Sequence, residues 1–347
     1  MDMDKEAQAW KEYSAPDEEM QNILASIPPI PSFADYGTAK ELRDAITAQI
    51  TRLVAAGIIT PVDWTGCIKQ DITIPVHDGV ELRAVVYKPL PSNQDKPGAL
   101  VVYFHGGGWT FGFPEAGERY FEPLVKELGV VVVSVAYRLA PERVSPGAVE
   151  DAGGAVKWCA ANASTLGADL RKGFIIAGSS AGGCLATVAA HQFVDEKIDS
   201  NVTGVVLLSP NLVHSDAVPA EWEGVYGSWE EFRDGVVLDR RGMEFFYEQY
   251  KPDPASPLAS PLLWHTHKGQ PRTYLQVTGA DPLRDEALIY EHVLRDAGVE
   301  TRMDVYSGIP HGGPDMFPMH SCAGKAVEDV KEAVKWILGT DESAGRE

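Results

Sequence analysis

The sequence is poor in cysteine and in basic residues, and it contains no long apolar run. Its four cysteines are scattered and form no C-x-x-C pair, so neither a zinc site nor a disulfide framework is indicated. Lys and Arg total 30 against 50 Asp and Glu, which gives a net charge of −20 without any basic cluster. This balance disfavours nucleic acids and anionic membrane surfaces as partners. Because no run reaches about 18 apolar residues, we expect no transmembrane helix.

The first residues show no pattern from which a secretory signal would be expected. Residues 1–6 are acidic and contain no apolar stretch of the kind that forms the centre of a secretory signal. We therefore expect a cytoplasmic protein that needs neither a metal nor a cofactor. Hydrophobic residues make up 44% of the chain, which is enough for a substantial core.

The most informative pattern is a G-x-S-x-G over residues 178–182, with a strand-like run at 174–177 before it and helix-forming residues after it. A serine on such a sharp strand-to-helix turn needs a strained backbone and small neighbours, and Gly178 and Gly182 supply them. The turn lifts the hydroxyl of Ser180 clear of the sheet and places it at a helix N-terminus, where negative charge is favoured. A glycine-rich loop with an incidental serine is the alternative. Ser179 would be the reactive residue only if the frame were shifted by one.

A second pattern follows the apolar run 99–104, which is typical of a buried parallel strand. Here His105 precedes three consecutive glycines, residues 106–108, and Trp109 follows them. Glycine amides can approach a ligand closely and can present two N–H donors in one direction, as acyl transfer requires. A flexible loop or a phosphate-binding turn is the alternative, but neither G-x-G-x-x-G nor a Walker lysine is present.

Two later strands each lead into a residue that can complete a catalytic triad with Ser180. The strand predicted over 273–278 precedes Asp281, and the strand predicted over 301–306 precedes His311. The order serine, acid, histidine is that of an α/β-hydrolase triad. Asp285 is a rival for the acid; we favour Asp281 because it lies at the strand end, and Asp285 suits the first turn of a helix.

Together these motifs resemble those of the hormone-sensitive-lipase-like carboxylesterases, the third α/β-hydrolase subfamily. The resemblance spans residues 70–340 and rests on five segments, 105–109, 137–142, 178–183, 281–285 and 311–312. It implies a triad of Ser180, Asp281 and His311. It implies an oxyanion hole formed by the backbone N–H groups of Gly107, Gly108 and Ala181, and structural support for the glycine loop from His105, Tyr137 and Glu142.

One segment departs from the family pattern. Where the family often has a bulky residue after the catalytic histidine, this chain continues with Gly312, Gly313, Pro314 and Asp315. The pocket wall beside His311 therefore stays unpredicted. Trp109, Phe111 and Phe113, which follow the glycine loop directly, are the candidates for lining the substrate pocket.

The alternation of strands and helices from residue 99 onward predicts a mostly parallel central sheet flanked by helices, the α/β-hydrolase fold. More than sixty residues separate the strand that ends at 208 from the one that begins at 273, too many for a simple crossover. We predict a cap insertion at 211–265, a core formed by 61–210 and 266–347, and a helical segment at 1–60 that contributes to the cap. Within the insertion, apolar spacing predicts amphipathic helices over 229–237 and 243–250.

The expected activity is that of a serine carboxyl-ester hydrolase that forms an acyl-enzyme with small to medium hydrophobic esters. A lyase, cyclase or lactonase that acts on a natural product with the same triad is the alternative. A non-catalytic small-molecule receptor is disfavoured because His311 is present. The resemblance also implies a homodimer formed through edge strands as an expected assembly.

Overall fold

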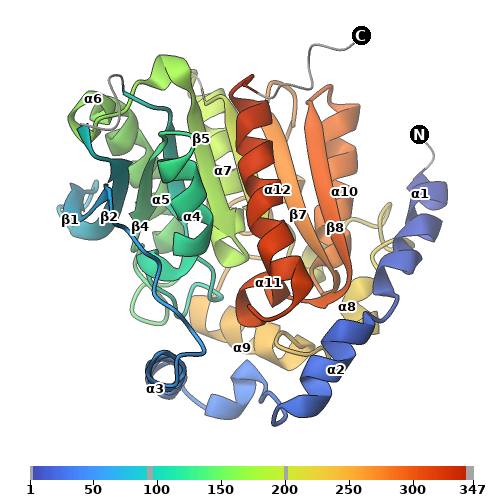
Figure 1. The fold of residues 1–347 in the computed structure, drawn as a ribbon. Helices are drawn as coiled ribbons and strands as arrows, with labels where there is room; N and C mark the ends of the chain where they lie inside the picture. The colour runs from blue at the N-terminus through green and yellow to red at the C-terminus, as the bar shows by residue number, and fades with distance from the viewer. Residues whose placement is uncertain (1–2, 92–96, 199–201, 341–347) are drawn as a thin grey trace.

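The computed structural model describes residues 3–91, 97–198 and 202–340, and its centre is one mostly parallel sheet (Figure 1). In the described residues eight strands lie in the order β1-β2-β4-β3-β5-β6-β7-β8. The pairs β1–β2 and β2–β4 are antiparallel, and the other five pairs are parallel. Their bounds are β1 (Cys67–Pro75), β2 (Glu81–Pro89), β3 (Leu100–Phe104), β4 (Val131–Val135), β5 (Phe174–Ser179), β6 (Gly204–Leu208), β7 (Arg272–Ala280) and β8 (Thr301–Pro310).

The central strands are apolar along their whole length because helices cover both faces of the sheet. Every residue of β3, β4 and β6 is buried, which explains their continuous rather than alternating hydrophobic pattern. On one face lie α4 (Glu118–Lys126) and α12 (Ser321–Ile337). On the other lie α5 (Gly147–Ala161), α7 (Ala181–Asp195) and α10 (Arg284–Asp296). Short segments between them are η4 (Pro114–Gly117), α6 (Ala163–Leu166) and η5 (Leu170–Lys172).

The N-terminal segment wraps around the molecule instead of entering the sheet. It comprises α1 (Met3–Trp10), η1 (Lys11–Ser14), α2 (Glu18–Ser26), η2 (Phe33–Tyr36) and α3 (Ala39–Ala55). In Figure 1 this segment, in blue, runs down one side and then passes below the sheet, where α9 also lies. Leu42 of α3 is fully buried in a small apolar cluster with Trp229 and Phe246 of the insertion. The N-terminal segment and the insertion therefore pack together at the carboxyl ends of the strands.

The insertion contains η6 (Ser215–Ala217), α8 (Ser228–Glu231), α9 (Arg240–Tyr250) and η7 (Pro261–Leu263). The helix predicted over 243–250 is confirmed by α9. The helix predicted over 229–237 is wrong, because the chain leaves helical geometry after one turn. The Gly235 amide donates to the Phe232 carbonyl at 2.9 Å, and Val237 adopts a φ of 71°. Val236, expected on an apolar helix face, is 38% exposed.

Candidate active site

The serine of the G-x-S-x-G pattern lies between β5 and α7 in a strained conformation. Ser180 has φ 52° and ψ −119°, a region that residues other than glycine rarely adopt. Its neighbours have to be small: a Cβ on Gly178 would overlap the carbonyl of Gly182, and a Cβ on Gly182 would overlap that of Phe104. The Ser180 N–H donates to the Leu208 carbonyl of the adjacent strand at 2.9 Å, which fixes the turn against the sheet.

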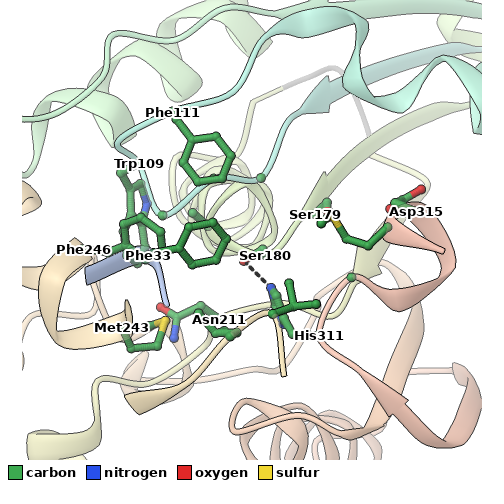
Figure 2. Close-up of a pocket in the computed structure, with 18 residues that line it drawn as sticks. Phe33, Trp109, Phe111, Ser179, Ser180, Asn211, Met243, Phe246, His311 and Asp315 are labelled. Carbon is green, nitrogen blue, oxygen red and sulfur yellow. Dashed lines mark hydrogen bonds between the residues drawn. The ribbon is translucent and has the colours of Figure 1, made fainter. Parts of the chain in front are cut away.

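Three predicted residues from separate elements meet at this turn. His311, at the end of β8, has its Nε2 2.9 Å from the Ser180 hydroxyl, as Figure 2 shows. Its Nδ1 lies 2.7 Å from Oδ2 of Asp281. Asp281, after β7, is only 1% exposed. Its carboxylate also accepts hydrogen bonds from Thr278 Oγ1 at 2.7 Å and from the Leu283 amide at 2.8 Å. The acid is thereby held in one orientation toward the imidazole.

The two rival residues have other partners. Asp285 accepts hydrogen bonds from the amides of Gly227 and Ser228, each at 2.7 Å, and pairs with Arg284 at 2.7 Å. It thus ties the start of α8 to the start of α10. The Ser179 hydroxyl hydrogen-bonds Tyr103 rather than His311. The geometry therefore favours Asp281 and Ser180 over these alternatives.

The glycine loop after β3 lies directly over the serine. Gly107 and Gly108 have φ values of 116° and 54°, and the amides of Thr110 and Phe111 donate to the Gly107 carbonyl at 2.9 and 3.0 Å. In the described part of the chain, the amides of Gly107, Gly108 and Ala181 donate to no backbone or side-chain acceptor. Such free donors beside a nucleophile suit an oxyanion.

His105 and Tyr137 support this loop from below. The His105 ring stacks on Tyr137 at a centroid distance of 4.4 Å, and its Nδ1–H donates to the Gly106 carbonyl at 2.8 Å. The Tyr137 hydroxyl donates to the His105 carbonyl at 2.9 Å. Burial lowers the pKa of His105 to about 4, so the ring is neutral near pH 7.

Glu142 supports the loop only through a residue that the sequence analysis did not identify. It binds the guanidinium of Arg43 with both carboxylate oxygens, at 2.8 and 2.7 Å. Arg43, on α3, donates in turn to the carbonyls of Thr110 at 2.7 Å and Ala140 at 2.6 Å. An arginine in an amphipathic helix has no local signature of such a role, because its partners lie far away in the sequence.

A cavity of about 140 Å³ opens above Ser180. Most of its wall is apolar, and the side chains concerned are Phe33, Trp109, Phe111, Val237, Leu238, Met243 and Phe246. Trp109 and Phe111 line it as predicted, but Phe113 does not and is 39% exposed. The reason is Gly112, whose φ of 115° turns the chain back against the His105 ring and carries the following residue away from the cavity.

Two polar lining residues were not identified from the sequence, Asn211 and Asp315. Asn211 follows β6 and is 1% exposed; its Nδ2 donates to Glu286 at 3.2 Å, while its Oδ1 has no partner among the described residues. Glu286 accepts the Leu212 amide at 2.6 Å as well, and its burial raises its carboxyl pKa well above the usual value. No local pattern marks Asn211, whereas Asp315 lies in the segment that departs from the family pattern.

Comparison with known proteins gives consistent results. A family described as "alpha/beta hydrolase fold" matches residues 101–314. Versiconal hemiacetal acetate esterase of Dothistroma septosporum is 36% identical over 281 residues, which cover 80% of this chain and 83% of that protein.

Two solved structures extend the likeness to nearly the whole chain. Vibralactone cyclase has a TM-score of 0.82 at 33% identity and covers 94% of this chain and 96% of its own. A bacterial heroin esterase has a TM-score of 0.80 at 26% identity, with coverages of 94% and 99%. Within the described residues no helix has the length and apolarity needed to cross a membrane. The chain belongs to the hormone-sensitive-lipase-like carboxylesterase family and has the α/β-hydrolase fold.

Proposed function

We propose that the protein hydrolyses small to medium hydrophobic carboxylic esters through an acyl-enzyme on Ser180. The observation that carries this proposal is the hydrogen-bonded series Ser180–His311–Asp281 opposite unpaired backbone amides. His311 Nε2 takes the proton from the Ser180 hydroxyl as the oxygen attacks the ester carbonyl. Asp281 fixes the imidazole tautomer and stabilises the imidazolium that forms.

The oxygen of the carbonyl becomes negatively charged when the carbon becomes tetrahedral. The amides of Gly107, Gly108 and Ala181 then stabilise it, and each such donor contributes about 3–4 kcal/mol in comparable sites. His311 next gives its proton to the leaving alcohol. In the second half of the cycle it removes a proton from water, which attacks the acyl-enzyme and releases the acid and Ser180.

The size and lining of the cavity support a small, mainly apolar substrate. A volume of about 140 Å³ has room for a short acyl group rather than a long chain. Relatives named for acetate esters point the same way: besides the versiconal hemiacetal acetate esterase, an ethyl acetate hydrolase of Pseudomonas putida is 29% identical over 80% of this chain.

Cyclisation is a second candidate function, favoured by one specific observation. The structure of vibralactone cyclase matches with a TM-score of 0.82. In such a reaction, a nucleophile within the substrate would replace water, and the same base and oxyanion donors would serve it.

The test is the rate of hydrolysis of p-nitrophenyl esters from acetate to decanoate by the wild type, Ser180→Ala and Ser179→Ala. We expect turnover of the short esters, loss of about 10⁴-fold or more in Ser180→Ala, and retained activity in Ser179→Ala. The third protein is the matched control, since it loses a neighbouring hydroxyl that does not contact His311. A wild type no faster than Ser180→Ala on every ester would refute hydrolysis. Labelling of Ser180 by a phosphonate would then direct attention to cyclisation.

A further inference from the structure

The cavity has one acidic lining residue among the described residues, Asp315, on the side of Ser180 opposite the aromatic wall. In Figure 2 Phe33, Phe246 and Met243 lie on one side of Ser180, while Ser179 and Asp315 lie on the other. Asp315 belongs to α11 (Gly313–Met316), four residues after His311. Its side chain is 36% exposed, and Asp315 lines the cavity together with Gly312.

The Asp315 carboxylate is only partly paired. Among the described residues the one cation within ion-pair distance is Arg119, whose Nη1 is 3.8 Å from Oδ1. That guanidinium already donates to two backbone carbonyls, those of Pro314 and Ala323, the latter at 2.7 Å. The Tyr120 hydroxyl also hydrogen-bonds the carboxylate. An ionised carboxylate offers about four acceptor positions, so these two partners do not use all of them.

The position of Asp315 relative to His311 indicates which part of a substrate would meet it. The leaving oxygen of an ester has to come within reach of His311 Nε2 to receive its proton. Asp315 and Gly312 continue the wall that begins at His311, so the alcohol arm of the ester extends along them. An unsatisfied carboxylate there attracts a cation or a hydrogen-bond donor and repels an anion.

We propose that Asp315 is a specificity-determining residue that selects esters whose alcohol arm carries an ammonium or hydroxyl group. This assignment rests on the proposed ester hydrolysis at Ser180, and it adds a substrate class to it. The acyl group would occupy the apolar side of the cavity, between Phe33, Phe246 and Met243.

The test compares two isosteric butyrates, the 2-(dimethylamino)ethyl ester, which is cationic near neutral pH, and the neutral 3-methylbutyl ester. In the wild type we expect kcat/KM to favour the cationic ester by about tenfold, the equivalent of roughly 1.4 kcal/mol. In Asp315→Asn, which keeps the shape of the side chain, the ratio should fall to about one. Since only the ratio is compared, a change in activity common to both esters cancels. Asp234→Asn is the control, because Asp234 is 91% exposed and loses the same charge outside the cavity.

The pH dependence of this ratio gives an independent readout. The partly buried position of Asp315 raises the pKa of its carboxyl above the usual value, so the preference for the cation should be full near neutral pH and fade as the pH falls. The other charged or titratable groups that face Asp315 are Arg119 and Tyr120 on α4, Tyr103 on β3 and His311.

Calorimetric binding of the same two esters to Ser180→Ala separates this proposal from the proposed function. Suppose that the wild type hydrolyses neither ester, that Ser180→Ala binds the cationic ester more tightly, and that the double variant Ser180→Ala/Asp315→Asn does not. The proposed hydrolysis would then be refuted, whereas the role of Asp315 in specificity would be supported. Equal ratios in wild type and Asp315→Asn, in turnover or in binding, would overturn the assignment of Asp315. The same conclusion follows if the wild type prefers the neutral ester.

Discussion

Two carboxylates four residues apart in the sequence, Asp281 and Asp285, illustrate how position decides the role of a residue. Both are almost fully buried, at 1% and 2% exposure. Asp281 contacts the imidazole of His311, whereas Asp285 accepts the amides of Gly227 and Ser228. Asp281 therefore orients the histidine beside Ser180, whereas Asp285 holds the insertion to the start of α10, although the two side chains are identical.

Replacement of each by asparagine should separate these roles. Asp281→Asn should lower kcat by about 10⁴-fold, because the amide no longer holds the required tautomer of His311. Asp285→Asn should change kcat by less than about tenfold but should destabilise the protein by about 1–3 kcal/mol, since the new NH2 group would face either the two backbone donors or the Arg284 guanidinium. Ester hydrolysis and urea unfolding on both variants check this. A larger kcat loss in Asp285→Asn than in Asp281→Asn would reverse the assignment.

Gly108 needs to lack a side chain for two reasons, its backbone conformation and its contact with Phe246. Its φ of 54° costs another residue about 1–2 kcal/mol, and a Cβ there would overlap the ring of Phe246. Gly108→Ala should therefore displace an oxyanion donor and lower kcat/KM at least tenfold, by analogy with the loss of such a donor. Gly57→Ala is the matched control: its φ is 71°, but nothing lies within 4 Å of the new methyl. Equal kcat/KM values for the two variants would contradict the prediction.

Among the elements, the buried strands were predicted well because their signal is local. The run at 99–104 differs from β3 by one residue at its start, and the strand predicted to end at 208 is β6, which ends at Leu208. The helix predicted over 229–237 failed because apolar spacing alone does not report where a chain turns. Gly235 and the positive φ of Val237 end the helix, and Val237 then packs at the cavity instead of on a helix face. Tertiary contacts outweighed the local pattern at that point.

The connection between α3 and the glycine loop is an element-scale feature that the sequence does not reveal. Arg43 is the link, through its bonds to Glu142 and to the carbonyls of Thr110 and Ala140. Arg43→Met keeps most of the apolar stem but leaves both carbonyls without this donor. We expect it to cost about 1.5–3 kcal/mol of unfolding free energy and to lower kcat/KM roughly tenfold, because the loop carries the oxyanion donors.

The control for this prediction lies on the same helix. Lys40 pairs with Asp44 at 2.6 Å, but its side chain is 83% exposed, and such a surface pair contributes little. Lys40→Met should therefore leave both urea unfolding and ester hydrolysis close to wild type. If Arg43→Met were as stable and as active as Lys40→Met, α3 would have no part in holding the glycine loop.

At the scale of the whole molecule, the cavity brings together the N-terminal segment, the glycine loop, the serine turn, the insertion and the end of β8. Ser180, Asp281 and His311 could be predicted because each follows a recognisable strand within an ordered set of motifs. Asn211 and Asp315 could not, since an amide or a carboxylate has no distinctive neighbours in the sequence. Their importance arises from the unpaired Oδ1 of Asn211 and the exposed edge of Asp315, and both are properties of the folded chain.

Buried neutral histidines couple the stability of the whole fold to pH. His191 is fully buried; Gln270 Nε2 lies 2.9 Å from its Nδ1, and its Nε2 lies 3.2 Å from the Tyr290 hydroxyl. In the neutral ring, the Gln270 amide donates to Nδ1 of His191, and the Nε2–H of His191 donates to the Tyr290 hydroxyl. A second proton, on Nδ1, would point at the NH2 group of Gln270, which is also a donor. Burial accordingly lowers the pKa of His191 to about 3.

Because the ring is neutral in the folded state and takes up a proton below about pH 6.5 in the unfolded state, its contribution is present above that pH and is lost as pH falls. Between about pH 7.5 and 5.5 one such histidine removes about 1.4 kcal/mol of unfolding free energy. His191→Gln should shrink the difference between these two pH values by about that amount. Asp315 and Glu286 have raised pKa values, so their contribution to the unfolding free energy changes with pH in the opposite direction. Both residues are the same in wild type and variant, so their contribution cancels when the two proteins are compared. Urea unfolding at the two pH values measures the effect, and His77→Gln is the control because His77 is half-exposed. If the difference in unfolding free energy between the two pH values were the same in His191→Gln as in the wild type, His191 could be protonated within the folded protein.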